Sequence, residues 1–116
     1  MDEQMSILIS IKKLLGIEAF YEAFDTDVII HINSVFMILT QLGYGPPEGF
    51  SIKGNSEQWT DYIKEENKIE AVKTYIYMKV KLNFDPPSSS AVIEAYKQFI
   101  NEFEWRINVQ AESTTT

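Results

Sequence analysis

Apolar residues recur at helical spacing along most of the chain, and each periodic stretch predicts an α-helix with one buried face. The clearest stretch carries Val28, Ile32, Val35, Leu39 and Leu42. Ile29 and Phe36 widen this stripe, which therefore predicts a helix at the centre of the core. The predicted helices span residues 3–15, 25–42, 56–63, 67–84 and 88–109, with one or two further helical turns at 18–24.

The ends of these segments carry residues that favour helix caps or breaks. Gly16 and Gly43 stand where a left-handed C-terminal cap is usual. Asp25, Thr26 and Asp27 supply a polar cap and acidic first-turn residues, and Asn67 with Glu70 resembles a capping box. The pair Pro86-Pro87 ends the preceding helix near Asn83 or Phe84. The chain is therefore predicted to be an all-α bundle of four to five helices.

Two segments lack helical periodicity. Residues 43–55 hold four of the five glycines and two of the four prolines, which predicts a long loop. Its Phe50 and Ile52 alternate with polar neighbours, so part of the loop could pair as a short strand with itself or with a second copy. Residues 110–116 are polar, which predicts an unstructured tail. The expected organisation is one helical domain over 1–109 and a tail over 110–116.

Charge narrows the choice of partners. The 116 residues include 10 Lys+Arg and 17 Asp+Glu, a net charge of -7. Such a surface repels phosphate, which argues against a protein that grips nucleic acid. It is compatible with a wall along which DNA slides. There is no cysteine, and no apolar run is long enough to cross a bilayer, so we expect a cytosolic product that does not contact a membrane.

Catalytic chemistry has little support in the sequence. The single histidine, His31, lies inside an apolar helix, where a structural role is the simpler interpretation. Asp25 and Asp27 flank a helix start and are better explained by capping than as an acid–base pair. We therefore predict no enzymatic activity, no cofactor and no metal site.

Aromatic residues are numerous for a short helical domain, so some should be covered by another subunit. Trp105 lies off the stripe formed by Val92, Phe99 and Phe103, which makes burial by a partner as plausible as burial in the chain itself. Arg106 is spaced to pair with Glu102. The lysine-rich helix after Lys68 and the acidic last helix form one possible pair of complementary faces. The candidate interface residues are Tyr44, Phe50, Ile52, Trp59, Trp105 and Arg106.

Several segments resemble a known family. They are Ile-Lys-Lys-Leu-Leu-Gly-Ile at 11–17, Phe-Asp-Thr-Asp at 24–27 before the apolar helix, Val-Lys-Thr-Tyr-Ile at 72–76, Phe-Asp-Pro-Pro at 84–87 and Glu-Trp-Arg at 104–106. Together they resemble the small head–tail connector, or adaptor, proteins of long-tailed bacteriophages. The resemblance implies an all-α virion protein, made in the bacterial cytoplasm and located in the neck, without enzymatic activity or cofactor.

The same resemblance implies the partners. Members of the family form a closed ring, by resemblance dodecameric, beneath the portal protein, with a neck or tail-completion protein on the tail side. DNA would pass through the ring as cargo without sequence recognition.

An acidic regulatory binder, such as a DNA mimic or an antitoxin-like partner, is the alternative. It would need denser carboxylates on one face, whereas here the acids are interleaved with lysines. A metal-dependent enzyme would need more histidines and carboxylates at ligand spacing.

Overall fold

A computed structural model describes residues 5–115, without the side chains of 111–115, and contains five α-helices and no strand within that range. They are α1 (Ile7–Leu14), α2 (Asp25–Gln41), α3 (Trp59–Tyr62), α4 (Glu66–Phe84) and α5 (Ser90–Thr115). The predicted all-α class is confirmed, as is a long connection between α2 and α3. The molecule measures 47 × 36 × 22 Å.

Helix α1 begins later than predicted. Ser6 is its N-cap and accepts a hydrogen bond from the N–H of Ile9 at 3.3 Å, so the helix starts at Ile7; the predicted start at Glu3 lies outside the described residues. Its end is as predicted, because Gly16 adopts a φ of +84°. The N–H of Ile17 then reaches the carbonyl of Lys12 at 2.8 Å, which closes a Schellman cap.

Residues 15–24 form turns, and the helical turns predicted at 18–24 are absent. The cause is Lys12, which is only 1% exposed. Its ammonium donates to the carbonyl oxygens of Ala19 at 3.0 Å and Tyr21 at 2.7 Å, and it forms an ion pair with Asp25 at 2.7 Å. Two carbonyl groups that a helix would use internally are thus bound by a buried cation.

Helix α2 is the central element, as its apolar stripe predicted. Val28, Ile32, Val35, Phe36 and Leu39 are buried, and α2 packs most extensively on α4. The predicted polar cap is wrong in detail, because the N-cap is Phe24, which makes no side-chain hydrogen bond to the helix. The predicted acidic first turn is present, and the carboxylate of Asp25 also forms the ion pair with Lys12.

The connection over residues 43–55 is fixed to α2 by a side chain. Asn33 Oδ1 accepts from the N–H of Ile52 at 2.8 Å, and its Nδ2 donates to the carbonyl of Ile52 at 2.9 Å. The amide of Asn33 therefore satisfies the groups that a neighbouring strand would have paired. The predicted strand does not form within the described residues, and the short α3 follows instead of a helix over 56–63.

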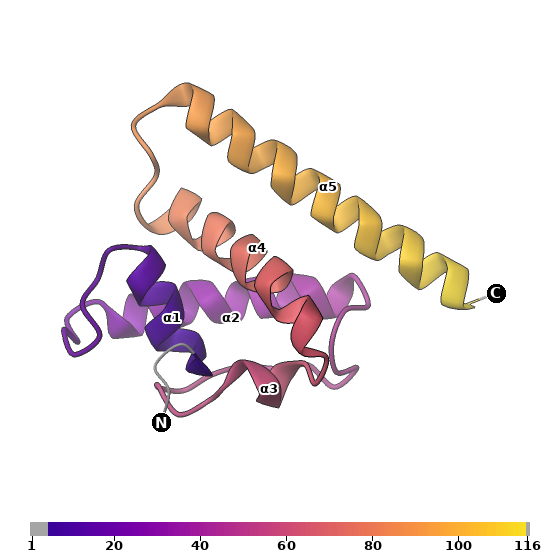
Figure 1. Cartoon of the computed structure of the whole chain (residues 1–116), viewed down its shortest axis with the longest axis horizontal. Coiled ribbons are helices and arrows are strands. Elements are labelled where there is room, and N and C mark those ends of the chain that lie inside the picture. The colour runs from indigo at the N-terminus through magenta and orange to yellow at the C-terminus, as the bar shows by residue number, and fades with distance from the viewer. Residues whose placement is uncertain (1–4, 116) are drawn as a thin grey trace.

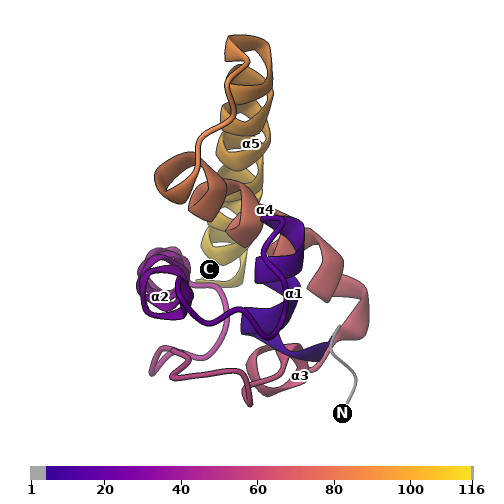
Figure 2. The ribbon, with the colours of Figure 1, turned by 90° about the vertical axis from the view of Figure 1, so that its left-hand side faces the viewer.

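Helices α4 and α5 lie antiparallel, joined by the turn around Pro86-Pro87 (Figure 1). The predicted α4 stripe of Ile69, Val72, Ile76 and Val80 is buried. The predicted capping box is wrong, because the N-cap is Glu65 and makes no side-chain cap bond. Figure 2 shows α5 at one end of the molecule, α4 between it and the α1–α2 pair, and α3 at the opposite end.

Helix α5 is longer than predicted. It continues to Thr115, so the prediction of an unstructured tail is wrong for residues 110–115, and Thr116 lies outside the described residues. The reason is that residues 110–115 contain neither glycine nor proline, and extending an existing helix costs far less than nucleating one. The predicted apolar stripe of this helix differs at its start, because Val92 is exposed and the next residue, Ile93, is half-buried instead. Further along the helix, Ile100 and Ile107 are buried.

Candidate interface surfaces

Two of the six predicted interface residues belong to the core of the chain itself. Trp59 is 1% exposed, and its indole Nε1 donates to Ser10 Oγ at 2.8 Å. Ile52 is buried beside Asn33. Neither side chain is accessible to another subunit, because the loop that carries Ile52 is bound to α2 and the indole of Trp59, the first residue of α3, is buried against α1.

Tyr44 and Phe50 are half-buried around the ring of Tyr62. The Tyr62 centroid lies 5.1 Å from that of Phe50, 4.6 Å from that of Phe36 and 6.3 Å from that of Tyr44. The pKa of the Tyr62 hydroxyl is raised because burial disfavours the phenolate. The loop aromatics are thus partly covered by their own chain, and coverage of their remaining surface by another subunit stays a prediction.

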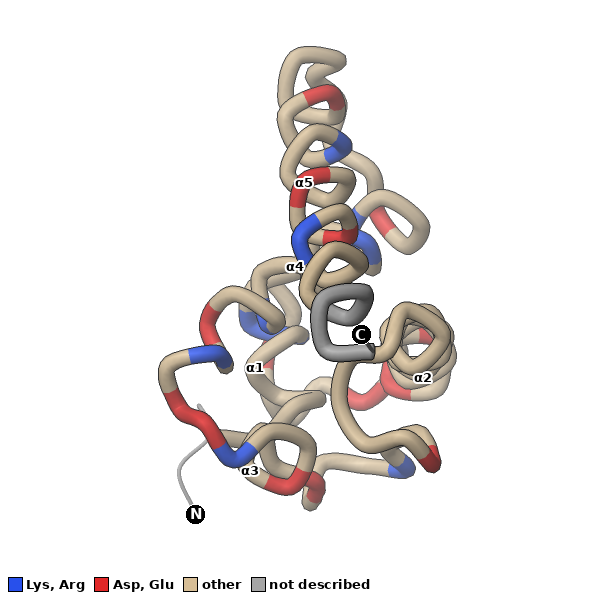
Figure 3. Tube along the Cα trace, turned by 90° about the vertical axis from the view of Figure 1, so that its right-hand side faces the viewer, with Lys and Arg blue, Asp and Glu red and all other residues tan. Residues whose placement is uncertain are grey.

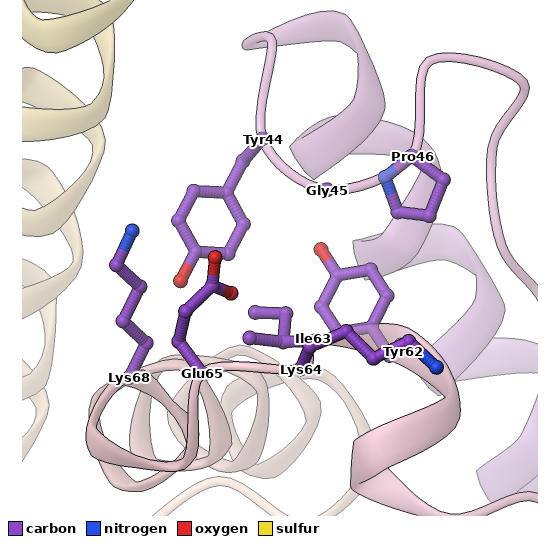
Figure 4. Close-up of a pocket in the computed structure, with 8 residues that line it drawn as sticks. All are labelled: Tyr44, Gly45, Pro46, Tyr62, Ile63, Lys64, Glu65 and Lys68. Atoms are coloured by element: carbon purple, nitrogen blue, oxygen red, sulfur yellow. The ribbon is translucent and has the colours of Figure 1, made fainter.

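A pocket of about 330 Å³ lies beside this cluster (Figure 4). Tyr44 and Tyr62 point into it from opposite sides, and Glu65 and Lys68 approach from the start of α4 (Figure 4). Burial, with a smaller effect of the Glu65 carboxylate, raises the pKa of Tyr44. We call this hollow the tyrosine pocket.

A second hollow of about 310 Å³ adjoins it and shares Tyr44 and Lys68. We call it the α4–α5 groove. Ala71 and the α5 side chains Phe99, Phe103 and Ile107 supply its apolar wall, and Arg106 stands beside them. The groove therefore combines an apolar floor with two cations, and it includes the candidates Tyr44 and Arg106.

The contact between α4 and α5 uses one carboxylate twice. Glu104 Oε2 accepts from the hydroxyl of Tyr75 at 2.7 Å and from Lys79 Nζ at 3.1 Å. The basic and acidic helices that were considered as complementary faces of two subunits are thus paired at this point within one chain. Both signs of charge occur along α5 when the molecule is viewed from the end where the chain terminates (Figure 3).

Trp105, on α5, is 64% exposed. Arg106 pairs with Glu102 at 2.6 Å, as the spacing predicted. Helix α5 thus packs one apolar face against α4 and leaves the side chain of Trp105 exposed to solvent.

The most exposed large apolar side chain was not among the predicted residues. Phe20 is 85% exposed in the segment between α1 and α2, next to the exposed Tyr21 and Phe24. We call Phe20 with its flanking Glu18 and Glu22 the acidic knob. The sequence does indicate this exposure. Phe20 lies between a capping glycine and the start of the next helix, and an apolar side chain in such a loop has few core residues to pack against.

The remaining chemistry is sparse. The His31 ring lies against Phe84, with 6.1 Å between centroids. Within the described residues there is no group of three or more His, Asp or Glu side chains placed to hold a metal ion. No helix in that part of the chain is long and apolar enough to span a membrane.

Comparison with known families gives the class of protein. The model of the phage connector protein family matches residues 7–114, so the chain belongs to that family. Phage connectors are structural proteins rather than enzymes, in agreement with the resemblance in the sequence. No curated protein and no solved structure matches the chain.

Proposed function

We propose that this protein is a head–tail connector of a long-tailed phage, which forms a closed ring beneath the portal and joins the DNA-filled head to the tail. The observation that carries the proposal is the match to the phage connector family across residues 7–114. Its partners are other copies of the chain, the portal protein and a tail-side neck or completion protein. DNA passes through the ring without sequence recognition.

The exposed apolar residues support a role in assembly. Phe20 and Trp105 are 85% and 64% exposed, and aromatic residues of this kind are enriched at protein interfaces. They lie on different elements, the segment before α2 and the last helix. A connector needs more than one contact surface, since it meets its own copies as well as head and tail proteins.

The net charge of -7 supports the proposed passage of DNA. A predominantly acidic wall repels the phosphate backbone and so avoids a strong grip on the sliding duplex.

Native mass spectrometry and negative-stain microscopy of the purified chain test the proposal, with and without the portal protein of the same phage. We expect one high-mass species whose mass is an integer multiple of 13.4 kDa, and annular particles. A chain that stays monomeric alone and does not bind the portal would contradict the proposal.

Trp105→Ala refines this test, with Asn108→Ala as a control on an exposed position of the same helix. If Trp105 contacts a neighbour, truncation should weaken assembly at least about tenfold, because interface tryptophans commonly contribute ~2 kcal/mol or more. Helicity by circular dichroism should not change. Equal loss of helicity and assembly would show that Trp105 only supports the fold.

A further inference from the structure

We infer that the acidic knob of one copy inserts Phe20 into the α4–α5 groove of the next copy. This contact rests on the proposed ring and names the surfaces that would build it.

The knob is held in position by the chain itself. The Lys12 ammonium binds the carbonyl oxygens of Ala19 and Tyr21, the residues on either side of Phe20. The backbone around the exposed ring is therefore anchored before any partner arrives. Anchoring in the free chain lowers the conformational entropy lost on binding, so the loop is preorganised for a contact that buries Phe20.

The groove has the size and lining that a phenyl ring requires. Its volume of about 310 Å³ is some ten times the ~30 Å³ that one water molecule occupies in the liquid. Ala71, Phe99, Phe103 and Ile107 offer apolar and aromatic contacts. An inserted benzyl group would meet ring edges and faces, the geometry that aromatic pairs favour.

The charges beside Phe20 and beside the groove favour a second copy of the chain as the molecule that occupies the groove. Glu18 and Glu22 flank Phe20 and are exposed, whereas Lys68 and Arg106 stand at the groove. Two copies that each carry a net charge of -7 repel one another overall, so a favourable contact must place acids opposite these cations. Lys68 has no ion pair within the described part of the chain and is available for this role.

The two surfaces lie on different parts of the molecule. The segment between α1 and α2 is at the left of Figure 1, whereas the start of α4 is near the middle and the second half of α5 is at the right. A knob-to-groove contact is therefore head-to-tail, and each added copy leaves one free knob and one free groove. Repetition of such a heterologous contact closes a ring when the rotation between copies permits it.

Assembly of full-length variants tests the contact, measured by sedimentation and native mass spectrometry under the conditions in which the wild type assembles. Phe20→Ser should weaken assembly at least about tenfold, as truncation of a central interface aromatic does. Met37→Ser removes another exposed apolar side chain, outside both surfaces, and should change assembly less than about twofold. Circular dichroism should show both variants folded.

Charge reversal identifies the occupant. Glu18→Lys with Glu22→Lys, or Lys68→Glu with Arg106→Glu, should each impair assembly. Both variants that carry Arg106→Glu lose the exposed Arg106–Glu102 pair within the chain. The quadruple variant restores the opposite charges between knob and groove at the wild-type net charge, and it should assemble better than either double variant.

Normal assembly of Phe20→Ser would overturn the inference while leaving the proposed function intact. So would a Phe20→Ser defect confined to portal binding, which would make the portal the occupant of the contact. A quadruple variant no better than the doubles would overturn the groove as the binding site. A wild-type chain that neither assembles alone nor binds the portal would overturn both the inference and the proposed function.

Discussion

The substitution Lys12→Met should destabilise the fold far more than a surface lysine change would. Lys12 is 1% exposed, and its ammonium contacts two carbonyl oxygens and the Asp25 carboxylate, all within 3.0 Å. Methionine keeps most of the packing of the alkyl stem but removes every polar contact. The carboxylate and both carbonyls then lose their partner together.

The magnitude follows from this arrangement. Removing one partner of a buried ion pair costs about 3–5 kcal/mol. Asp25 keeps 26% of its side chain in contact with solvent, so water compensates part of the loss and the lower end, about 3 kcal/mol, applies. For a domain of this size such a loss lowers the melting temperature by about 10 °C or more.

Urea unfolding followed by circular dichroism measures the effect, with Lys13→Met as the matched control. Lys13 is the exposed neighbour, and its substitution should change the free energy of unfolding by less than about 0.5 kcal/mol. Asp25→Asn should combine with Lys12→Met non-additively, because the two groups interact directly. Equal effects of the two lysine substitutions would refute the assigned role of Lys12.

Three further predictions concern the loop and the tyrosines. Gly45→Ala should lower the free energy of unfolding by about 1–3 kcal/mol, because φ is +81° and a Cβ would lie 2.7 Å from the Tyr62 ring. In the control Gly54→Ala the added Cβ meets no atom within 4 Å, so thermal unfolding should be nearly unchanged. Asn33→Asp should destabilise by about 1–3 kcal/mol, because a carboxylate oxygen replaces the donor to the carbonyl of Ile52; unchanged urea stability would contradict this. Tyrosines whose pKa is raised stay protonated to higher pH in the folded state than in the unfolded state, so the free energy of unfolding should fall as pH rises above about 10. Tyrosinate absorbance should rise together with the loss of helicity. This prediction concerns Tyr44, Tyr62, Tyr75 and Tyr77. A free energy of unfolding that does not change between pH 10 and 12, the pKa of Tyr77 being about 12, would contradict it.

The long helices could be predicted because apolar residues at helical spacing mark the face of a helix that is buried. The stripes of α2 and α4 are buried as expected, and both lie in the largest helix–helix contact. Gly16 and Gly43 could be placed at helix ends because both positions require a positive φ, which costs glycine little. The final turns of α5 are not predicted from the sequence, because a polar composition is typical of an unstructured tail even where no residue breaks a helix.

The candidate interface was harder to predict, since it depends on contacts between distant segments. Trp59 and Trp105 are the same residue type, but only the structure shows that Trp59 is buried and donates a hydrogen bond to Ser10, whereas Trp105 is exposed. Lys12 gave no signal, because a lysine is rarely buried in full. The groove joins Tyr44 to α4 and α5, three segments that are remote in sequence, so no local pattern could have shown it.

Labelling virions is the most direct test of the central claim that this protein is a connector in the neck. An antibody against the chain, or a tagged full-length copy, is located by electron microscopy on intact particles and on separated heads and tails. The account predicts label only at the junction between head and tail, and on one of the two parts after separation. Label spread over the capsid or along the tail, or virions that contain none of the protein, would contradict it.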